Sequence, residues 1–82
     1  MTKQEVLEVI KRSIEEIVPD IHTENINMED SLKEIGVNSV DRMDIIVTTL
    51  EELELHMQMV QFGGLKNIGE IVDVILKEYR GE

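Results

Sequence analysis

Ser39 is the residue whose type and setting suggest chemistry. It follows Asn38, a good N-cap, and it precedes Asp41, whose charge favours the exposed amides of a first helical turn, so a helix is expected to start at Ser39. A serine at that position projects its hydroxyl from an accessible helix end, where unpaired amides and the helix dipole favour a phosphate. The sequence therefore permits a phosphodiester on Ser39, although serine is also common at helix starts for structural reasons alone.

The other chemistries that the chain could perform find little support. A serine hydrolase needs a nucleophile elbow, but the chain has no Gly-x-Ser-x-Gly segment, and its two histidines, His22 and His56, are expected in exposed loops. Two histidines without cysteine are a poor ligand set for zinc. The acidic window 30–41 fails as a calcium loop because Leu32 and Ile35 occupy a ligand position and the glycine position. We predict no catalytic residue and no metal site.

Size and composition limit the kind of protein. With 82 residues the chain can bury one small core, so residues 1–82 are expected to form a single domain. The absence of cysteine fits a reducing cytoplasm, and it means that acyl-thioester chemistry would need a thiol from outside the chain. No secretion signal or apolar run of about 20 residues is present. We expect a cytoplasmic monomer that does not insert into a membrane.

The net charge of −10 lies mostly in the middle of the chain. Residues 19–60 hold ten acidic residues but only two basic ones, Lys33 and Arg42. Such a chain repels phosphate backbones, so nucleic acid binding is excluded. The acidic segment is either a solvated face that keeps the protein soluble or a docking surface for partners with basic patches.

Apolar periodicity predicts helices on both sides of a long loop. Thr2 and Glu5 have the spacing of a capping box that starts a helix over residues 3–17, and Pro19 ends it. The segment from 19 to 38 has no clean period and is expected to be a loop with one helical turn near residues 30–35, ended by Gly36. Long loops in small domains are often functional.

The second half of the chain continues the pattern. A helix is predicted over 39–53, and its core face is expected to comprise Met43, Ile46, Leu50 and Leu53. Residues 56–62 form either an extended stretch or a short helix, and two glycines then break the chain. The last helix starts after Asn67, and its apolar face is Ile68, Ile71, Val72, Ile75, Leu76 and Tyr79. The predicted fold is all-α: a small four-helix bundle of three main helices and a short third helix, with a long loop between helices I and II.

The segment from Asp30 to Val40, which reads Asp-Ser-Leu-Lys-Glu-Ile-Gly-Val-Asn-Ser-Val, resembles the modification motif of acyl carrier proteins. In that motif an acid, a leucine, a glycine and an (Asp or Asn)-Ser-aliphatic step open the second helix. The resemblance extends over nearly the whole chain. It implies that a phosphopantetheinyl transferase moves 4'-phosphopantetheine from coenzyme A onto Ser39, and that the new thiol carries acyl groups.

One feature departs from the common pattern of the family. Most carriers have Asp before the serine, and here Asn38 takes its place. Together with Met59-Val60-Gln61-Phe62, this neighbourhood is similar to discrete carriers of bacterial polyketide β-branching cassettes, although such carriers often have Pro near the position of Gln58. The resemblance implies a carrier that donates acetyl units, formed by decarboxylation of a malonyl thioester. Its partners would be an acyltransferase, a decarboxylating ketosynthase-like enzyme and a hydroxymethylglutaryl-synthase-like enzyme.

On this interpretation the protein is a substrate and shuttle for other enzymes, and not an enzyme. Asp41, Asp44 and Glu51 are expected to steer basic partner surfaces through weak, salt-sensitive contacts, and Val40 to add apolar contact beside the arm. Two alternatives remain open at this point. One is a peptidyl or aminoacyl carrier protein that uses the same serine, and the other is an acidic helical interaction module without a cofactor.

Overall fold

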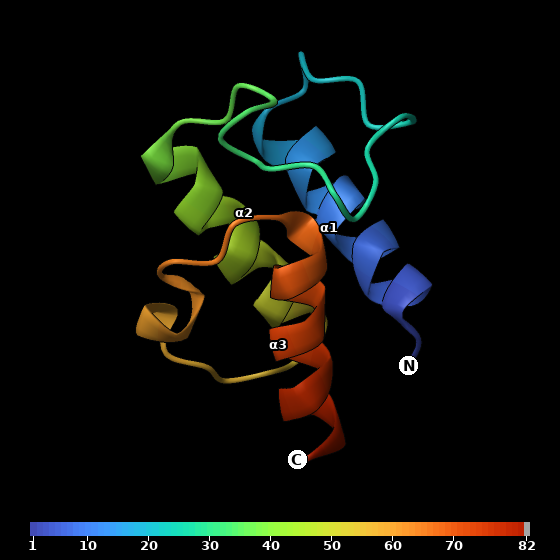
Figure 1. Cartoon of the computed structure of the whole chain (residues 1–82), viewed down its shortest axis with the longest axis vertical. Helices are drawn as coiled ribbons and strands as arrows, with labels where there is room; N and C mark the ends of the chain where they lie inside the picture. Colours follow the sequence, from blue (N-terminus) through green and yellow to red (C-terminus); the bar gives the residue numbers. More distant parts are fainter. Residues whose placement is uncertain (82) are drawn as a thin grey trace.

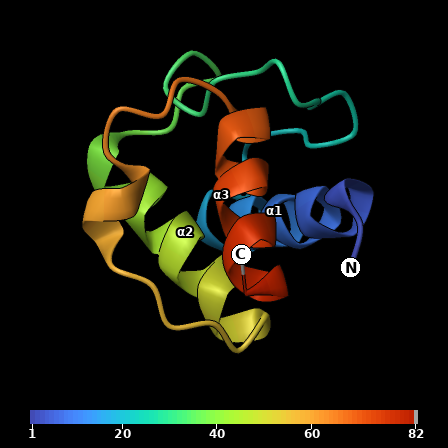
Figure 2. The ribbon, with the colours of Figure 1, turned by 60° about the horizontal axis from the view of Figure 1, so that its bottom comes forward.

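The computed structural model, which describes residues 1–81, is all-helical, as the sequence predicts (Figure 1). It contains α1 (Lys3–Ile17), α2 (Ser39–Glu52), a short 3-10 helix η1 (Met59–Phe62) and α3 (Ile68–Arg80), with no strand in the described part of the chain. The short third helix is therefore a single 3-10 segment. The helices pack around a common centre, and the view along the bundle shows η1 on the outer side of α2 and α3 (Figure 2).

Local signals account for the helix ends. At the start of α1 the Thr2 hydroxyl accepts from the Glu5 N–H at 3.1 Å, and the Glu5 carboxylate accepts from the Thr2 N–H at 2.8 Å, which is the predicted capping box. The helix ends at Ile17, two residues before Pro19. The side chain of Asn67 caps α3 by accepting from the Glu70 N–H at 2.9 Å.

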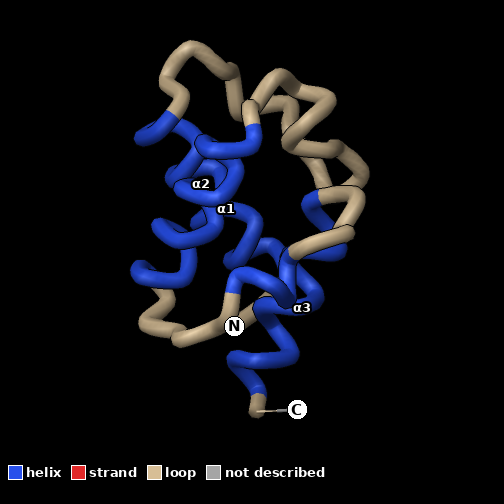
Figure 3. The backbone as a smooth tube through the Cα atoms, turned by 90° about the vertical axis from the view of Figure 1, so that its left-hand side faces the viewer, coloured by secondary structure: helices blue, strands red, loops and turns tan. Residues whose placement is uncertain are grey.

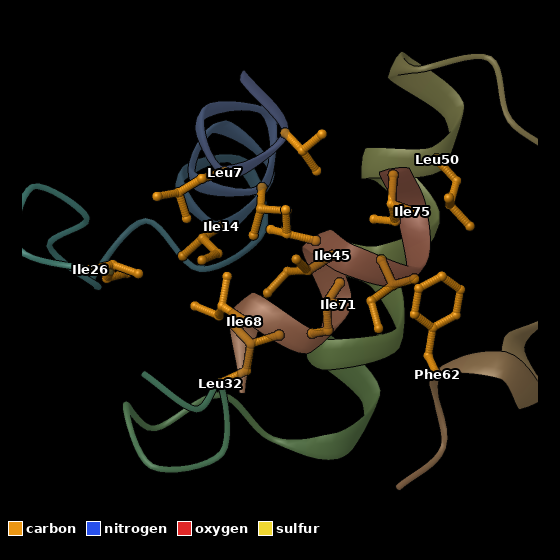
Figure 4. Close-up of a cluster of buried hydrophobic side chains, with 14 of the residues drawn as sticks. Leu7, Ile14, Ile26, Leu32, Ile45, Leu50, Phe62, Ile68, Ile71 and Ile75 are labelled. Atoms are coloured by element: carbon orange, nitrogen blue, oxygen red, sulfur yellow. The ribbon is translucent and has the colours of Figure 1, made fainter. Parts of the chain in front are cut away.

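The core lies between the three helices and is closed by η1 and the long loop (Figure 4). It is built almost entirely from aliphatic side chains, with Phe62 as its single aromatic residue within the described chain. Ile26 and Leu32 bring the long loop into this core and are 6% and 5% exposed. The loop is thus anchored, which fixes the segment that leads to Ser39.

Two polar side chains are buried between α1 and α2. The Thr49 hydroxyl donates to the Ser13 hydroxyl at 3.0 Å and also lies 2.8 Å from the Ile45 carbonyl oxygen, while the Ser13 hydroxyl donates to the Val9 carbonyl. Because both groups are hydrogen-bonded, their burial carries no unpaired polar atom. This contact helps to fix how α2, and with it Ser39, sits against α1.

The predicted core face of α2 is partly wrong. Met43 is 53% exposed, and the buried residues are Ile45, Ile46, Thr49 and Leu50. Because residues are spaced about 100° apart around a helix, the buried face is centred roughly 50° from the predicted one and leaves Met43 at its edge. The pattern of apolar residues misled the prediction because Thr49 is polar and buried.

Tyr79 is a second correction. It continues the apolar period of α3, yet it is 47% exposed, and the buried face ends at Leu76. The last turn of α3 projects beyond the other helices (Figure 1), which agrees with the exposure of Tyr79. Within residues 1–81, no helix is long and apolar enough to cross a membrane.

The long loop runs across the end of the bundle at which α2 and α3 begin (Figures 1 and 3). Its Met28 and Asp30 carbonyls accept from the first amides of α3, those of Gly69 at 2.8 Å and Ile68 at 2.9 Å. These bonds satisfy donors that a helix start leaves unpaired. The loop therefore ties the start of α3 to the segment that presents α2.

Candidate functional site

Ser39 is the first residue of α2 and is exposed. Before it, the Asn38 side chain forms two hydrogen bonds with Asp41: its oxygen accepts from the Asp41 N–H at 2.8 Å, and its amide donates to the Asp41 carboxylate at 3.2 Å. The predicted N-cap is confirmed. An aspartate at this position could not form the second of these bonds, because its side chain has no N–H to donate.

The turn before α2 sets the place of the serine. The Ile35 N–H donates to the Ser31 carbonyl at 3.0 Å, so the predicted helical turn is present, and Gly36 follows it at a φ of 103°. This left-handed conformation favours glycine. Val37 then enters the core with 2% exposure. The buried Val37 holds the chain in place, and the two residues after it emerge at the surface as Asn38 and Ser39.

A pocket of about 810 Å³ opens beside Ser39, between α2, η1 and the two loops at the end of the bundle. Its apolar lining comes from Leu32, Met43, Ile46, Met59, Phe62, Leu65 and Ile71. Ser39 is part of the lining, so a group attached to its hydroxyl would start at the border of an apolar pocket. The sequence indicated the serine but not this pocket, because its walls come from segments far apart in the chain.

Three basic side chains, Lys33, Arg42 and Lys66, also line the pocket, together with two acidic ones, Glu29 and Glu34. Thus both of the basic residues that the acidic middle of the chain contains lie here. Sequence reasoning did not assign them a role.

The predicted partner-binding residues divide into two groups. Val40 is 67% exposed, and Asp44 and Glu51 are exposed on the same face of α2, since positions four and eleven residues apart nearly align on a helix. Asp41 lies about 100° around the helix from Val40, is only half-exposed, and uses its carboxylate to accept from Asn38. The structure therefore places three of the four residues together and gives Asp41 a structural contact.

Sequence reasoning missed part of the apolar surface near this face. Met43 and Val47 are 53% and 40% exposed on α2, and Val60 of η1 is 77% exposed. Met43, which the apolar period predicts to be in the core, is thus part of this surface. The periodicity of α2 contained this information, since Val40, Met43 and Val47 lie within about 60° of one another around the helix.

His22 and His56 are exposed outside the helices, as predicted. In residues 1–81 no group of three or more His, Cys, Asp or Glu side chains is arranged to hold a metal ion.

The comparisons with known proteins identify the class. The family model described as "phosphopantetheine attachment site" matches residues 3–75. The chain belongs to this family of carrier proteins, whose members carry 4'-phosphopantetheine on a serine. Members of this family are not themselves catalytic. The match decides against an interaction module that has no cofactor.

Two matched proteins indicate which kind of carrier protein the chain resembles. The polyketide biosynthesis acyl-carrier-protein AcpK of Bacillus subtilis (strain 168) is 40% identical over 75 residues, which are 92% of each chain. A chain in the crystal structure of the HMG synthase of the curacin biosynthetic pathway, in complex with an acetyl-donor acyl carrier protein, matches with a TM-score of 0.82 and 39% identity. That match covers 92% of this chain and 96% of the other. This protein is thus similar to acyl carrier proteins in sequence and in fold.

Proposed function

We propose that Ser39 is the attachment site of the phosphopantetheine arm. The observation that carries this proposal is that Ser39 is the exposed first residue of α2, on the border of the apolar pocket and within the Asp30–Val40 motif. A phosphodiester on its hydroxyl lies at the positive end of the helix dipole and stays open to a modifying enzyme. Once attached, the arm supplies the terminal thiol that the cysteine-free chain lacks and that binds acyl groups as thioesters.

Modification in vitro tests this assignment. The protein is incubated with coenzyme A and a broad-specificity phosphopantetheinyl transferase, and its intact mass is measured. We expect a gain of one phosphopantetheine group in the wild type and in Ser31→Ala, a matched control within the same motif. Ser39→Ala should gain nothing. An equal gain in Ser39→Ala would refute the assignment.

We further propose that this carrier serves polyketide biosynthesis and donates acetyl units to a hydroxymethylglutaryl-synthase-like enzyme for β-branching. Support comes from the likeness to AcpK and from the high structural similarity to a chain of a complex between an HMG synthase and an acetyl-donor carrier. The protein then acts as substrate and shuttle. An acyltransferase and a decarboxylating ketosynthase-like enzyme would load and convert the acyl group before donation.

The exposed face of α2 is suited to brief docking. Asp44 and Glu51 present carboxylates, and Val40 and Val47 present apolar contact beside them. Exposed charge pairs contribute only about 0.2–1 kcal/mol each and weaken with salt, so a partner with a basic surface is attracted and then released. Such contacts favour a high association rate over high affinity, as a shuttle requires.

The partner is tested with an HMG synthase of a β-branching pathway. The acetyl-loaded protein should transfer its labelled acetyl group to that enzyme, and the transfer is followed by the mass of both proteins. We expect Asp44→Asn and Glu51→Gln each to raise the Kd of the complex between the protein and this enzyme roughly 2- to 5-fold at low salt. Glu78→Gln, an exposed acid on α3, should have no effect. Lack of transfer, or an equal effect of the control, would contradict the proposal.

A further inference from the structure

The basic residues that line the pocket form no ion pair within residues 1–81. Within residues 1–81 the ion pairs are Lys3 with Asp73, Lys11 with Glu8 and Arg12 with Glu52. Lys33, Arg42 and Lys66 line the pocket beside Ser39 and form none. Cations left unpaired at one pocket are therefore available to an external anion.

Arg42 is the best placed of the three. It lies three residues after Ser39 on α2, and side chains at that spacing are neighbours on the helix surface, with Cβ atoms roughly 5–6 Å apart. Its Nη1 donates to the Val37 carbonyl at 3.1 Å, so the half-buried side chain is bent back toward the start of the helix. This bond holds the guanidinium near Ser39 before anything is attached there.

The guanidinium has donors left over. It carries five N–H groups in a planar fork, and the bond to Val37 uses only one nitrogen. An arginine fork matches the oxygens of a phosphate group and can bind two of them at once. The phosphodiester that links an arm to Ser39 adds one negative charge to a protein of net charge −10. Along α2, Arg42 is the cation nearest to Ser39, and its bond to the Val37 carbonyl keeps it there.

We propose that Arg42 binds the phosphodiester on Ser39 and so holds the base of the arm at the mouth of the pocket. The proposal rests on the attachment at Ser39 proposed above. Lys33 and Lys66 come from other segments and lack the backbone bond that fixes Arg42 beside Ser39.

A thermal double-difference experiment isolates this contact from any structural role of Arg42. The midpoint Tm is measured for the apo and holo forms of the wild type, Arg42→Gln and Lys66→Gln. We expect attachment of the arm to raise the Tm of the wild type by about 2–5 °C more than it raises the Tm of Arg42→Gln. This is the difference that one exposed charge pair gives in a domain of this size. Destabilisation common to both forms of a variant cancels. Lys66→Gln, which removes the same charge from the same pocket, should behave as the wild type.

The phosphorus resonance of the holo proteins provides a second measurement. The ³¹P chemical shift of the phosphodiester should change in Arg42→Gln and stay unchanged in Lys66→Gln. An equal Tm response in the wild type and Arg42→Gln, or an equal loss in Lys66→Gln, would overturn the proposal. These outcomes presuppose the mass gain of the holo form, so failure of modification at Ser39 would refute the attachment site, whereas modification without coupling refutes only the role of Arg42.

Discussion

Asn38 caps α2 directly before Ser39, the proposed attachment site, and replacing it tests how α2 begins. Asn38→Ala removes both hydrogen bonds to Asp41, at 2.8 and 3.2 Å. Loss of an N-cap costs about 1 kcal/mol, and in a domain of this size that lowers Tm by about 4–8 °C. Asn67→Ala, which removes the equivalent cap of α3, should cost a similar amount and serves as calibration.

Asn38→Asp should behave differently. The new carboxylate still accepts from the Asp41 N–H and gains about 0.3–1 kcal/mol from the helix dipole. It loses the amide that donates to the Asp41 carboxylate, and two like charges about 4 Å apart in water repel by about 1 kcal/mol. The terms nearly cancel, so we expect stability within about 0.5 kcal/mol of the wild type, rising as salt screens the repulsion.

Thermal unfolding followed by far-ultraviolet circular dichroism, at low and high salt, measures both variants. If Asn38→Asp is as unstable as Asn38→Ala, then the side-chain oxygen that accepts from the Asp41 N–H is not the source of the stability that Asn38 provides. If its stability does not depend on salt beyond that of the wild type, the two carboxylates do not interact. Either result would refute the reasoning from the cap geometry.

Three further predictions concern the fold that presents Ser39. Ile46→Ala should cost about 2–3 kcal/mol in chemical denaturation, whereas the exposed Met43→Ala should stay within about 0.5 kcal/mol; equal costs would contradict the observed face of α2. Gly36→Ala forces a side chain into a φ of 103° and should cost about 1–3 kcal/mol, whereas Gly63→Ala, at a negative φ, should not. The Thr2 N–H bound to the Glu5 carboxylate lowers the pKa of Glu5, so its stabilisation is present at neutral pH and is lost as the pH falls through that lowered pKa. Glu5→Gln should therefore lower Tm at neutral pH and not in acid, and a pH-independent difference would contradict this.

The helices and the place of Ser39 at the start of α2 could be predicted because their causes are local. The Thr2 and Glu5 capping box, Pro19, and the Asn38 cap act between residues that are near each other in the chain. The apolar period of α3 was equally clear up to Leu76. Even so, the residues around Ser39 indicate only that a phosphate could be attached there. The resemblance to acyl carrier proteins is what implies that the attached group is phosphopantetheine.

Which face of a helix is buried depends on its partners, and here sequence reasoning failed. Met43 fits the apolar period of α2, but Thr49 takes a buried position because Ser13 of α1 accepts its hydroxyl. Because Thr49 is polar, the apolar period of α2 predicts a buried face that leaves Thr49 out. The prediction that Tyr79 is buried was wrong for a related reason, since the last turn of α3 projects beyond the other helices (Figure 1).

The sequence by itself determined where α2 starts, that Ser39 stands first in it, and that acidic side chains follow along one side, because caps, turns and helical spacing are properties of neighbouring residues. Only the tertiary structure decided what Ser39 lies beside. The pocket forms where the long loop, α2 and the segment around η1 meet, and the bend of Arg42 toward the Val37 carbonyl depends on how that loop is anchored in the core. Contacts between distant segments are set by packing, and no local pattern encodes them.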